Sequence, residues 1–246
     1  MPSVPPGPSV VGPKLIHRSV LAERLIDFEI EPCAEFAVEM HPGGYSLGEE
    51  WEGLPKSAQS SENGVILISI VDSLTGIRPR LALLPPFPIS DASDSNSFDT
   101  IRQHMVNHHA IAILLLRLGN WAIAIAEDGE LVVTKTGSRY VKNQHKKGGQ
   151  SSNRFRRGRE EWIRELFDQA GEVASARFRD YSGHLEYLAM GGDRVVLGQF
   201  LKRIKLPDGL SDRALPNRIS VDKPGRKALD AAVRDAWSYR MYEFVD

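Results

Sequence analysis

The sequence predicts a mixed α/β protein, and three observations carry this prediction. First, strand-like apolar segments follow one another closely at 110–118, 120–127 and 130–137. Second, the segment beginning near Ser151 has apolar residues at the i, i+3, i+4 and i+7 spacing of an amphipathic helix. Third, strand and helix patterns alternate from there to the end of the chain. Helices packed on a sheet are the layer architecture that such an order favours.

The chain is expected to divide into a lead-in and two folded units. Residues 1–13 are rich in proline and glycine and are predicted to be an extended lead-in. Residues 14–97 are predicted to form a small α+β unit, because 64–71 is an apolar, β-branched strand pattern and 14–30 fits either a helix or a pair of strands. Residues 98–246 are predicted to form the second unit, which follows a loop of small polar residues.

The first half of the second unit is predicted from spacing and turn chemistry. Residues 98–110 have helical spacing. Gly119-Asn120 and Asp128-Gly129 are hairpin-turn dipeptides, so the three strands that they separate are expected to form an antiparallel meander. The long helix follows, and its apolar stripe is expected to bury Trp162 together with Leu166 and the apolar residues after it.

The second half alternates strands and helices. Residues 184–190 are predicted to be a strand, and Asp193 is predicted to cap the helix that follows. A short strand is expected at 215–221, and Pro224 is expected to open the last helix. These elements complete a sheet with helices packed on it.

Composition indicates an ordinary globular protein. The 246 residues are 41% hydrophobic and 26% charged, with the single cysteine Cys33, so no disulfide can form within the chain. The N-terminus lacks a signal-peptide pattern, and the longest apolar run is too short to cross a bilayer. We expect a cytoplasmic, monomeric protein with no membrane partner.

The net charge of −1 hides a strongly basic segment. Residues 131–159 hold nine Lys or Arg and no Asp or Glu, which leaves the rest of the chain at −10. A solvated helix face usually mixes both signs. A basic segment concentrated in this way instead indicates a polyanionic partner such as RNA.

Other candidate sites are weak. His104 and His108 have i,i+4 spacing with His109 beside them, but no third ligand is evident, so no metal site is predicted. The Gly-Gly-Asp at 191–193 lacks the phosphate-binding patterns, and a turn followed by a helix cap explains it. No serine sits in a nucleophile elbow and Cys33 has no companion motif, so covalent catalysis is not expected, and neither is a cofactor.

The segment 146–161, "KKGGQSSNRFRRGREE", resembles the peptide-release loop of the eukaryotic and archaeal class-1 release factors. There a Gly-Gly-Gln is followed by a small polar residue, an Arg-Phe pair and a basic helix. Upstream, Lys135, Arg139 and Tyr140 match the signature of the Vms-like branch, the release-factor-like peptidyl-tRNA hydrolases of ribosome quality control. The resemblance covers roughly residues 98–245 and is sharpest over 135–160.

The resemblance implies a fold, an activity and a set of site residues. It implies a ribonuclease-H-like central domain that hydrolyses the peptide–tRNA ester on the large ribosomal subunit. The implied catalytic residues are Gly148, Gly149 and Gln150, with Gln150 positioning water. The Gln amide and nearby N–H groups can act without a titratable side chain. Together with the basic segment, the resemblance predicts RNA contacts at Lys135, Arg139, Tyr140, Lys142, Lys146, Lys147, Arg154, Arg156, Arg157 and Arg159.

Two alternatives stay open beside this interpretation. One is a non-catalytic factor that binds the ribosome or tRNA. The other is a tRNA nuclease, which would need clustered carboxylates for metal ions; Asp180 and Asp193 are candidates only if the fold brings them together. The absence of an Asn-Ile-Lys-Ser motif and of a following GTPase-docking domain favours ribosome rescue over stop-codon reading.

Overall fold

A computed structural model of the chain describes residues 9–31, 35–72, 76–89, 97–140 and 150–245, without the side chains of 150–153 and 155. The chain forms two compact units. The first comprises Met1–Asn107 and Trp237–Asp246, and the second comprises His108–Ala236. Among the described residues, no helix combines the length and the apolar character needed to cross a membrane.

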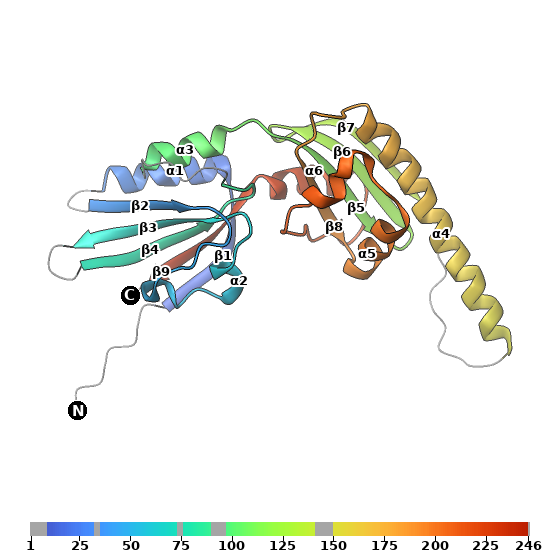
Figure 1. The fold of residues 1–246 in the computed structure, drawn as a ribbon, viewed down its shortest axis with the longest axis horizontal. Helices are drawn as coiled ribbons and strands as arrows, with labels where there is room; N and C mark the ends of the chain where they lie inside the picture. Colours follow the sequence, from blue (N-terminus) through green and yellow to red (C-terminus); the bar gives the residue numbers. More distant parts are fainter. Residues whose placement is uncertain (1–8, 32–34, 73–75, 90–96, 141–149, 246) are drawn as a thin grey trace. The chain divides into compact units, whose positions relative to one another are not determined.

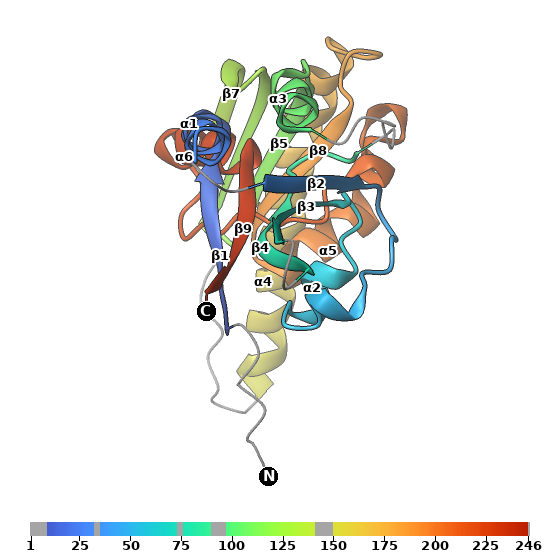
Figure 2. The same ribbon diagram turned by 90° about the vertical axis from the view of Figure 1, so that its left-hand side faces the viewer.

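The first unit is built around a five-stranded antiparallel sheet with the order β1-β9-β4-β3-β2. Its elements are β1 (Ser9–His17), α1 (Arg18–Glu29), β2 (Glu35–His41), a 3-10 turn (Glu49–Trp51), α2 (Lys56–Gln59), β3 (Val65–Asp72), β4 (Gly76–Leu84), α3 (Phe98–Val106) and β9 (Ser238–Val245). Helices α1 and α3 lie on one face of this sheet and α2 on the other (Figure 2). Alternate side chains of the strands therefore enter two separate cores.

The second unit contains a four-stranded sheet with the order β7-β6-β5-β8. Its elements are β5 (Ala110–Arg117), β6 (Asn120–Glu127), β7 (Glu130–Ser138), α4 (Gln150–Arg179), β8 (Tyr187–Gly192), α5 (Arg194–Arg203), a 3-10 segment (Pro207–Arg213) and α6 (Arg226–Ala236). Strands β5, β6 and β7 form the predicted antiparallel meander, and β8 is parallel to β5. Sheets of this kind with helices packed on them confirm the predicted mixed α/β class.

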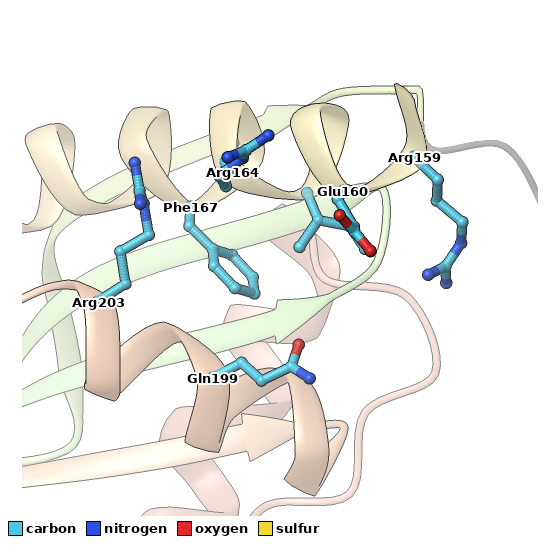
Figure 3. Close-up of a pocket in the computed structure, with 7 residues that line it drawn as sticks. Arg159, Glu160, Arg164, Phe167, Gln199 and Arg203 are labelled. Carbon is cyan, nitrogen blue, oxygen red and sulfur yellow. The ribbon is translucent and has the colours of Figure 1, made fainter. Parts of the chain in front are cut away.

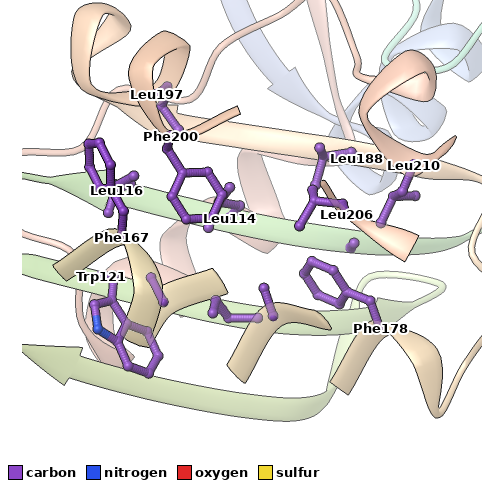
Figure 4. Close-up of a cluster of buried hydrophobic side chains, with 14 of the residues drawn as sticks. Leu114, Leu116, Trp121, Phe167, Phe178, Leu188, Leu197, Phe200, Leu206 and Leu210 are labelled. Atoms are coloured by element: carbon purple, nitrogen blue, oxygen red, sulfur yellow. The ribbon is translucent and has the colours of Figure 1, made fainter. Parts of the chain in front are cut away.

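The core of the second unit lies between this sheet and helices α4 and α5 (Figure 4). Leu114 and Leu116 of β5 pack there against Phe167 of α4 and Phe200 of α5, whose rings meet edge to face at 5.7 Å. The residues between them in β5 point to the opposite face of the sheet, where α6 packs. Because both faces are covered, β5 and β6 are apolar almost throughout, whereas the edge strand β7 is partly exposed and more polar.

The second hairpin turn falls at Asp128-Gly129 as predicted, and the first falls one residue earlier than predicted, at Leu118-Gly119, because Asn120 pairs with Arg117 as the first residue of β6. Gly119 has φ +97°, Asp128 has φ +53° and Gly129 has φ +92°, as tight hairpin turns require. Asp193 caps α5 as predicted, since its carboxylate accepts hydrogen bonds of 2.9 Å from the N–H groups of Val195 and Val196.

The division between the units differs from the expected boundary at residue 98. Helix α3 packs with α1 in the first unit, and β9 pairs with both β1 and β4. The chain thus returns to its first unit after completing the second. Strand β1 also begins at Ser9, inside the segment expected to be a lead-in, because it pairs with β9.

The strand expected at 215–221 is reduced to isolated bridges, which join Gly191 to Ile219 and Leu188 to Ala214. Pro216 has no N–H to donate to a ladder, which explains why the pairing is fragmentary. Trp162 was expected in the buried stripe of α4, but it lies partly exposed, with the buried stripe starting at Leu166.

Two glycines of α4 should respond in opposite ways to alanine. A Cβ at Gly158 would meet nothing within 4 Å, so Gly158→Ala should stabilise the helix locally by about 0.5–1 kcal/mol. A Cβ at Gly171 would lie 2.8 Å from the Ile204 side chain, so Gly171→Ala should destabilise the protein by about 1–3 kcal/mol through overpacking.

Amide hydrogen exchange around residue 158 measures the first effect, and urea unfolding measures the second. A stabilising Gly171→Ala substitution would show that Ile204 does not pack on this glycine as described.

Candidate functional site

Helix α4 extends well past the sheet that supports it (Figure 1). Its 30 residues span about 45 Å at 1.5 Å per residue. Among the described side chains of α4, the buried apolar ones lie in its second half, at Leu166, Phe167, Ala170, Ala174 and Phe178. Among the described side chains that precede Leu166 in the helix, none is fully buried. We call the first three turns, residues 150–161, the arm.

Gln150 is the first residue of α4 and therefore stands at the outer end of the arm. The first N–H groups of a helix have no partner within the helix, and the helix dipole places partial positive charge there. The remaining predicted residues of this region, Lys142, Lys146, Lys147, Gly148 and Gly149, lie outside the described residues, as does the side chain of Gln150.

The described basic side chains of the arm face solvent. Arg154, Arg156 and Arg157 are exposed and Arg159 is half-buried. Arg156 pairs with Glu160 one turn later at 3.1 Å. Lys135, in the middle of β7, is also exposed. The first turn of the helix holds no acidic residue, so its outer end is positively charged.

Gly137 fits the end of β7 closely against Trp121. These two residues are cross-strand partners in β7 and β6. A Cβ at Gly137 would lie 2.3 Å from the Trp121 ring, so only glycine leaves room for that ring to cross the strand. The Trp121 Nε1–H then donates to the Gln169 Oε1 of α4 over 3.4 Å.

Arg139 and Tyr140, the next residues along the chain, also contact α4. The Arg139 guanidinium donates to the Glu165 carboxylate, and the Arg139 N–H donates to the Gly119 carbonyl over 2.9 Å. The Tyr140 and Trp162 rings lie with their centroids 6.1 Å apart at 58°. Arg139 and Tyr140 are predicted RNA contacts; in this structure each contacts α4, and each remains exposed, Tyr140 by 76%.

The α4 residues in these three contacts form a row that sequence reasoning missed. Trp162, Glu165 and Gln169 are spaced at i, i+3 and i+7, so they share one face of the helix. This face adjoins the buried stripe but is polar apart from Trp162. The spacing is visible in the sequence, but its partners are 22 to 48 residues away and are brought near only by the fold.

A shallow hollow of about 460 Å³ lies between α4 and α5 (Figure 3). Arg203 is held beside it by two hydrogen bonds to Asp168, of 2.7 and 2.8 Å. These bonds lower the pKa of Asp168 and raise that of Arg203. The residues lining the hollow are Arg159, Glu160, Ile163, Arg164, Phe167, Gln199 and Arg203.

The three histidines do not gather around one point. His104 is in the first unit and forms a hydrogen bond with the buried Tyr239 hydroxyl at 3.0 Å. His108 and His109 are in the second unit, where they pair with Asp128 and Glu186 at 2.6 and 3.0 Å. In the part of the chain that the structure describes, no three His, Cys, Asp or Glu side chains form a metal-binding group.

The Gly-Gly-Asp turn and the candidate carboxylates have structural roles here. A Cβ at Gly192, whose φ is +110°, would lie 2.2 Å from the Leu116 carbonyl, which makes glycine necessary. Asp193 is used as a helix cap, and Asp180 lies 3.5 Å from Arg177. Strand β5 and the edge strand β8 beside it contain no acidic residue.

Curated relatives of this chain are archaeal release factors. It is 26% identical over 197 residues to the Aeropyrum pernix protein named "Peptide chain release factor subunit 1", covering 78% of this chain and 53% of that protein. It is also 26% identical over 160 residues to the protein of the same name from Archaeoglobus fulgidus, covering 63% and 39%. The chain thus spans about half the length of these relatives or less.

Solved structures similar to this chain include an archaeal translation termination factor, aRF1, with 18% identity and a TM-score of 0.42; the match covers 90% of this chain and 70% of that one. The Vms1 mitochondrial localization core matches with 15% identity and a TM-score of 0.43, covering 70% and 74%.

The family described as "Actinobacteria/chloroflexi VLRF1 release factor" has a family model that matches residues 109–242, more than half of the chain. The match runs from the start of the β5–β7 meander through α4 and includes the row of α4 residues that contacts β7. The chain therefore belongs to the actinobacterial and chloroflexi VLRF1 release-factor family, within the class-1 release-factor-like superfamily and its Vms-like branch.

Proposed function

We propose that this protein is a ribosome-acting peptidyl-tRNA hydrolase that frees nascent chains from stalled complexes, with Gln150 as its catalytic residue. The observation that carries the proposal is the place of Gln150 at the outer end of a basic helical arm, in a member of a release-factor family. The proposed partners are the large ribosomal subunit and peptidyl-tRNA, which a cytoplasmic protein would meet.

The reaction is the hydrolysis of the ester between the peptide and the ribose at the tRNA 3′ end. Water adds to the carbonyl carbon, the bond to the ribose oxygen breaks, and the proton lost by the water ends on that oxygen. An amide can orient the attacking water without ionising. The first N–H groups of α4, which have no partner within the helix, are suited to stabilise the developing oxyanion. Ribosomal RNA and the terminal ribose would complete the site.

The arm suits delivery of this group into an RNA-walled cavity. Residues 150–161 reach about 18 Å beyond Trp162, and Arg154, Arg156 and Arg157 of the arm are exposed. Contacts between arginine and phosphate position a protein on RNA without reading its sequence. The nuclease alternative has no support in the described residues, since no metal-binding carboxylate cluster is found there.

Gln150→Ala should lower the rate of peptide release by about 10²–10³-fold, because a preorganised group is lost at the reacting carbonyl. The measurement is single-turnover release of labelled peptide from peptidyl-tRNA on isolated large subunits, with excess protein. Gln199→Ala removes a matched amide from α5 and should release at the parent rate.

If Gln150→Ala releases as fast as the parent, Gln150 is not catalytic. If the parent binds large subunits but releases nothing, the non-catalytic rescue factor becomes the better description. Intact tRNA after the reaction separates ester hydrolysis from RNA cleavage.

Arg157→Ala should weaken binding to large subunits and reduce the slope of log affinity against log salt by about one, because one phosphate contact is lost. Arg177→Ala is the matched control near the other end of α4, where the arginine lies 3.5 Å from Asp180. Equal salt slopes for the parent and Arg157→Ala would remove Arg157 from the RNA interface.

A further inference from the structure

Three contacts join β6 and the two residues that directly follow β7 to one face of α4. They are Trp121 with Gln169, Arg139 with Glu165, and Tyr140 with Trp162. We call them the β7–α4 seam. The pairs are ordered along α4: Trp121 contacts the helix furthest from its start, Arg139 contacts it closer to the start, and Tyr140 closest. The seam therefore runs outward along the helix, toward Gln150.

The seam ends where the arm begins. Trp162 is twelve residues after Gln150, a rise of about 18 Å. The next position outward on the same face is Gly158, which has no side chain and no atom within 4 Å of a would-be Cβ. No buried side chain of the described residues fixes the arm beyond this point. Ile163, next to Trp162, also packs on the core, so the base of the arm is held by Ile163 together with Trp162 and Glu165.

The same contacts hold the other end of the chain segment that leads to Gln150. Arg139 and Tyr140 follow β7 directly, and the Arg139 N–H is also bonded to the Gly119 carbonyl in the β5–β6 turn. The pair formed by Arg139 and Glu165 is half-exposed, with side-chain exposures of 46% and 42%. An exposed ion pair adds little to the free energy of unfolding. Its main effect is therefore to hold Arg139 against α4.

We propose that Trp162 and Glu165 are positioning residues for peptide release, acting through Tyr140 and Arg139 to fix the base of the arm. This inference rests on the proposed function, because it concerns the placement of Gln150 on the carbonyl. A small misplacement of a catalytic group costs a large factor in rate without changing how tightly the protein binds. In this proposal the two residues act through Tyr140 and Arg139 and not by contact with substrate or RNA.

Glu165→Gln distinguishes a positioning role from RNA contact by Arg139, because the two roles predict different effects on the release rate and on the protein concentration that gives half the maximal rate. If Arg139 acts through Glu165, Glu165→Gln lowers the release rate at saturating protein by about 10-fold and leaves the half-saturating concentration unchanged. If Arg139 instead binds phosphate, removing the carboxylate frees its guanidinium and lowers the half-saturating concentration.

The Arg139→Gln variant and the double variant Arg139→Gln/Glu165→Gln complete a double-mutant cycle for the pair formed by Arg139 and Glu165. Positioning predicts that the double variant is no slower than Arg139→Gln alone, because both substitutions break one interaction. Asp168→Asn is the matched control. It breaks another arginine–carboxylate pair of α4, with Arg203 of α5 and similar exposures of 42% and 51%, and should keep the parent rate.

Trp162 is tested by a conservative pair of variants. Trp162→Phe keeps an aromatic ring against Tyr140 and should retain most of the release rate. Trp162→Leu should lose about 10-fold at unchanged half-saturating concentration. Thermal unfolding of each variant reports whether the fold is retained.

Hydrogen exchange of residues 154–161 gives a readout that does not depend on activity. Glu165→Gln and Trp162→Leu should speed exchange in the arm, while Asp168→Asn should not. Unchanged exchange in the arm, or a lowered half-saturating concentration for Glu165→Gln, overturns the positioning role.

If the parent releases no peptide, the proposed function fails, and the exchange data still decide whether the seam holds the arm.

Discussion

The packing of the second half of α4 against its sheet makes the exposed first half possible. A separate helix of twelve residues is marginal in water, because starting a helix costs more than extending one. Leu166, Phe167 and the apolar residues after them tie the second half to the core, and the arm continues as added turns of a helix that already exists. The place of Gln150 therefore depends on burial that begins sixteen residues away.

Charge is distributed along α4 in a way that favours an anionic partner at its outer end. Arginines near a helix N-terminus oppose the helix dipole and repel one another. Glu160 offsets part of this repulsion by pairing with Arg156, whereas Glu165 and Asp168 pair with Arg139 and Arg203 outside the helix. The remaining positive charge of the arm is a cost for the free protein, and phosphate groups would relieve it. This electrostatic strain supports the proposed contact with RNA.

Much of the second unit could be predicted because its signals are local. Gly119 and Asp128-Gly129 form hairpin turns by their own backbone preferences, and Asp193 caps the helix that it directly precedes. The pairing of β1 and β4 with β9 could not be predicted in the same way. This pairing joins residues more than 150 positions apart in the sequence. Which side chains of β9 are buried depends on the strands that pair with it, so the sequence of β9 alone does not predict them.

The sequence by itself determined the mixed α/β class, the meander, the long amphipathic helix and the basic segment around Gly148-Gly149-Gln150, because each follows from turn chemistry, periodicity or charge within a short stretch. Only the tertiary structure decided where the units divide and how the base of the arm is held. Arg139 and Tyr140 look the same in sequence whether they face RNA or face α4. Their partners, Glu165 and Trp162, come within reach because the sheet and the helix pack together, and no local pattern encodes that distance.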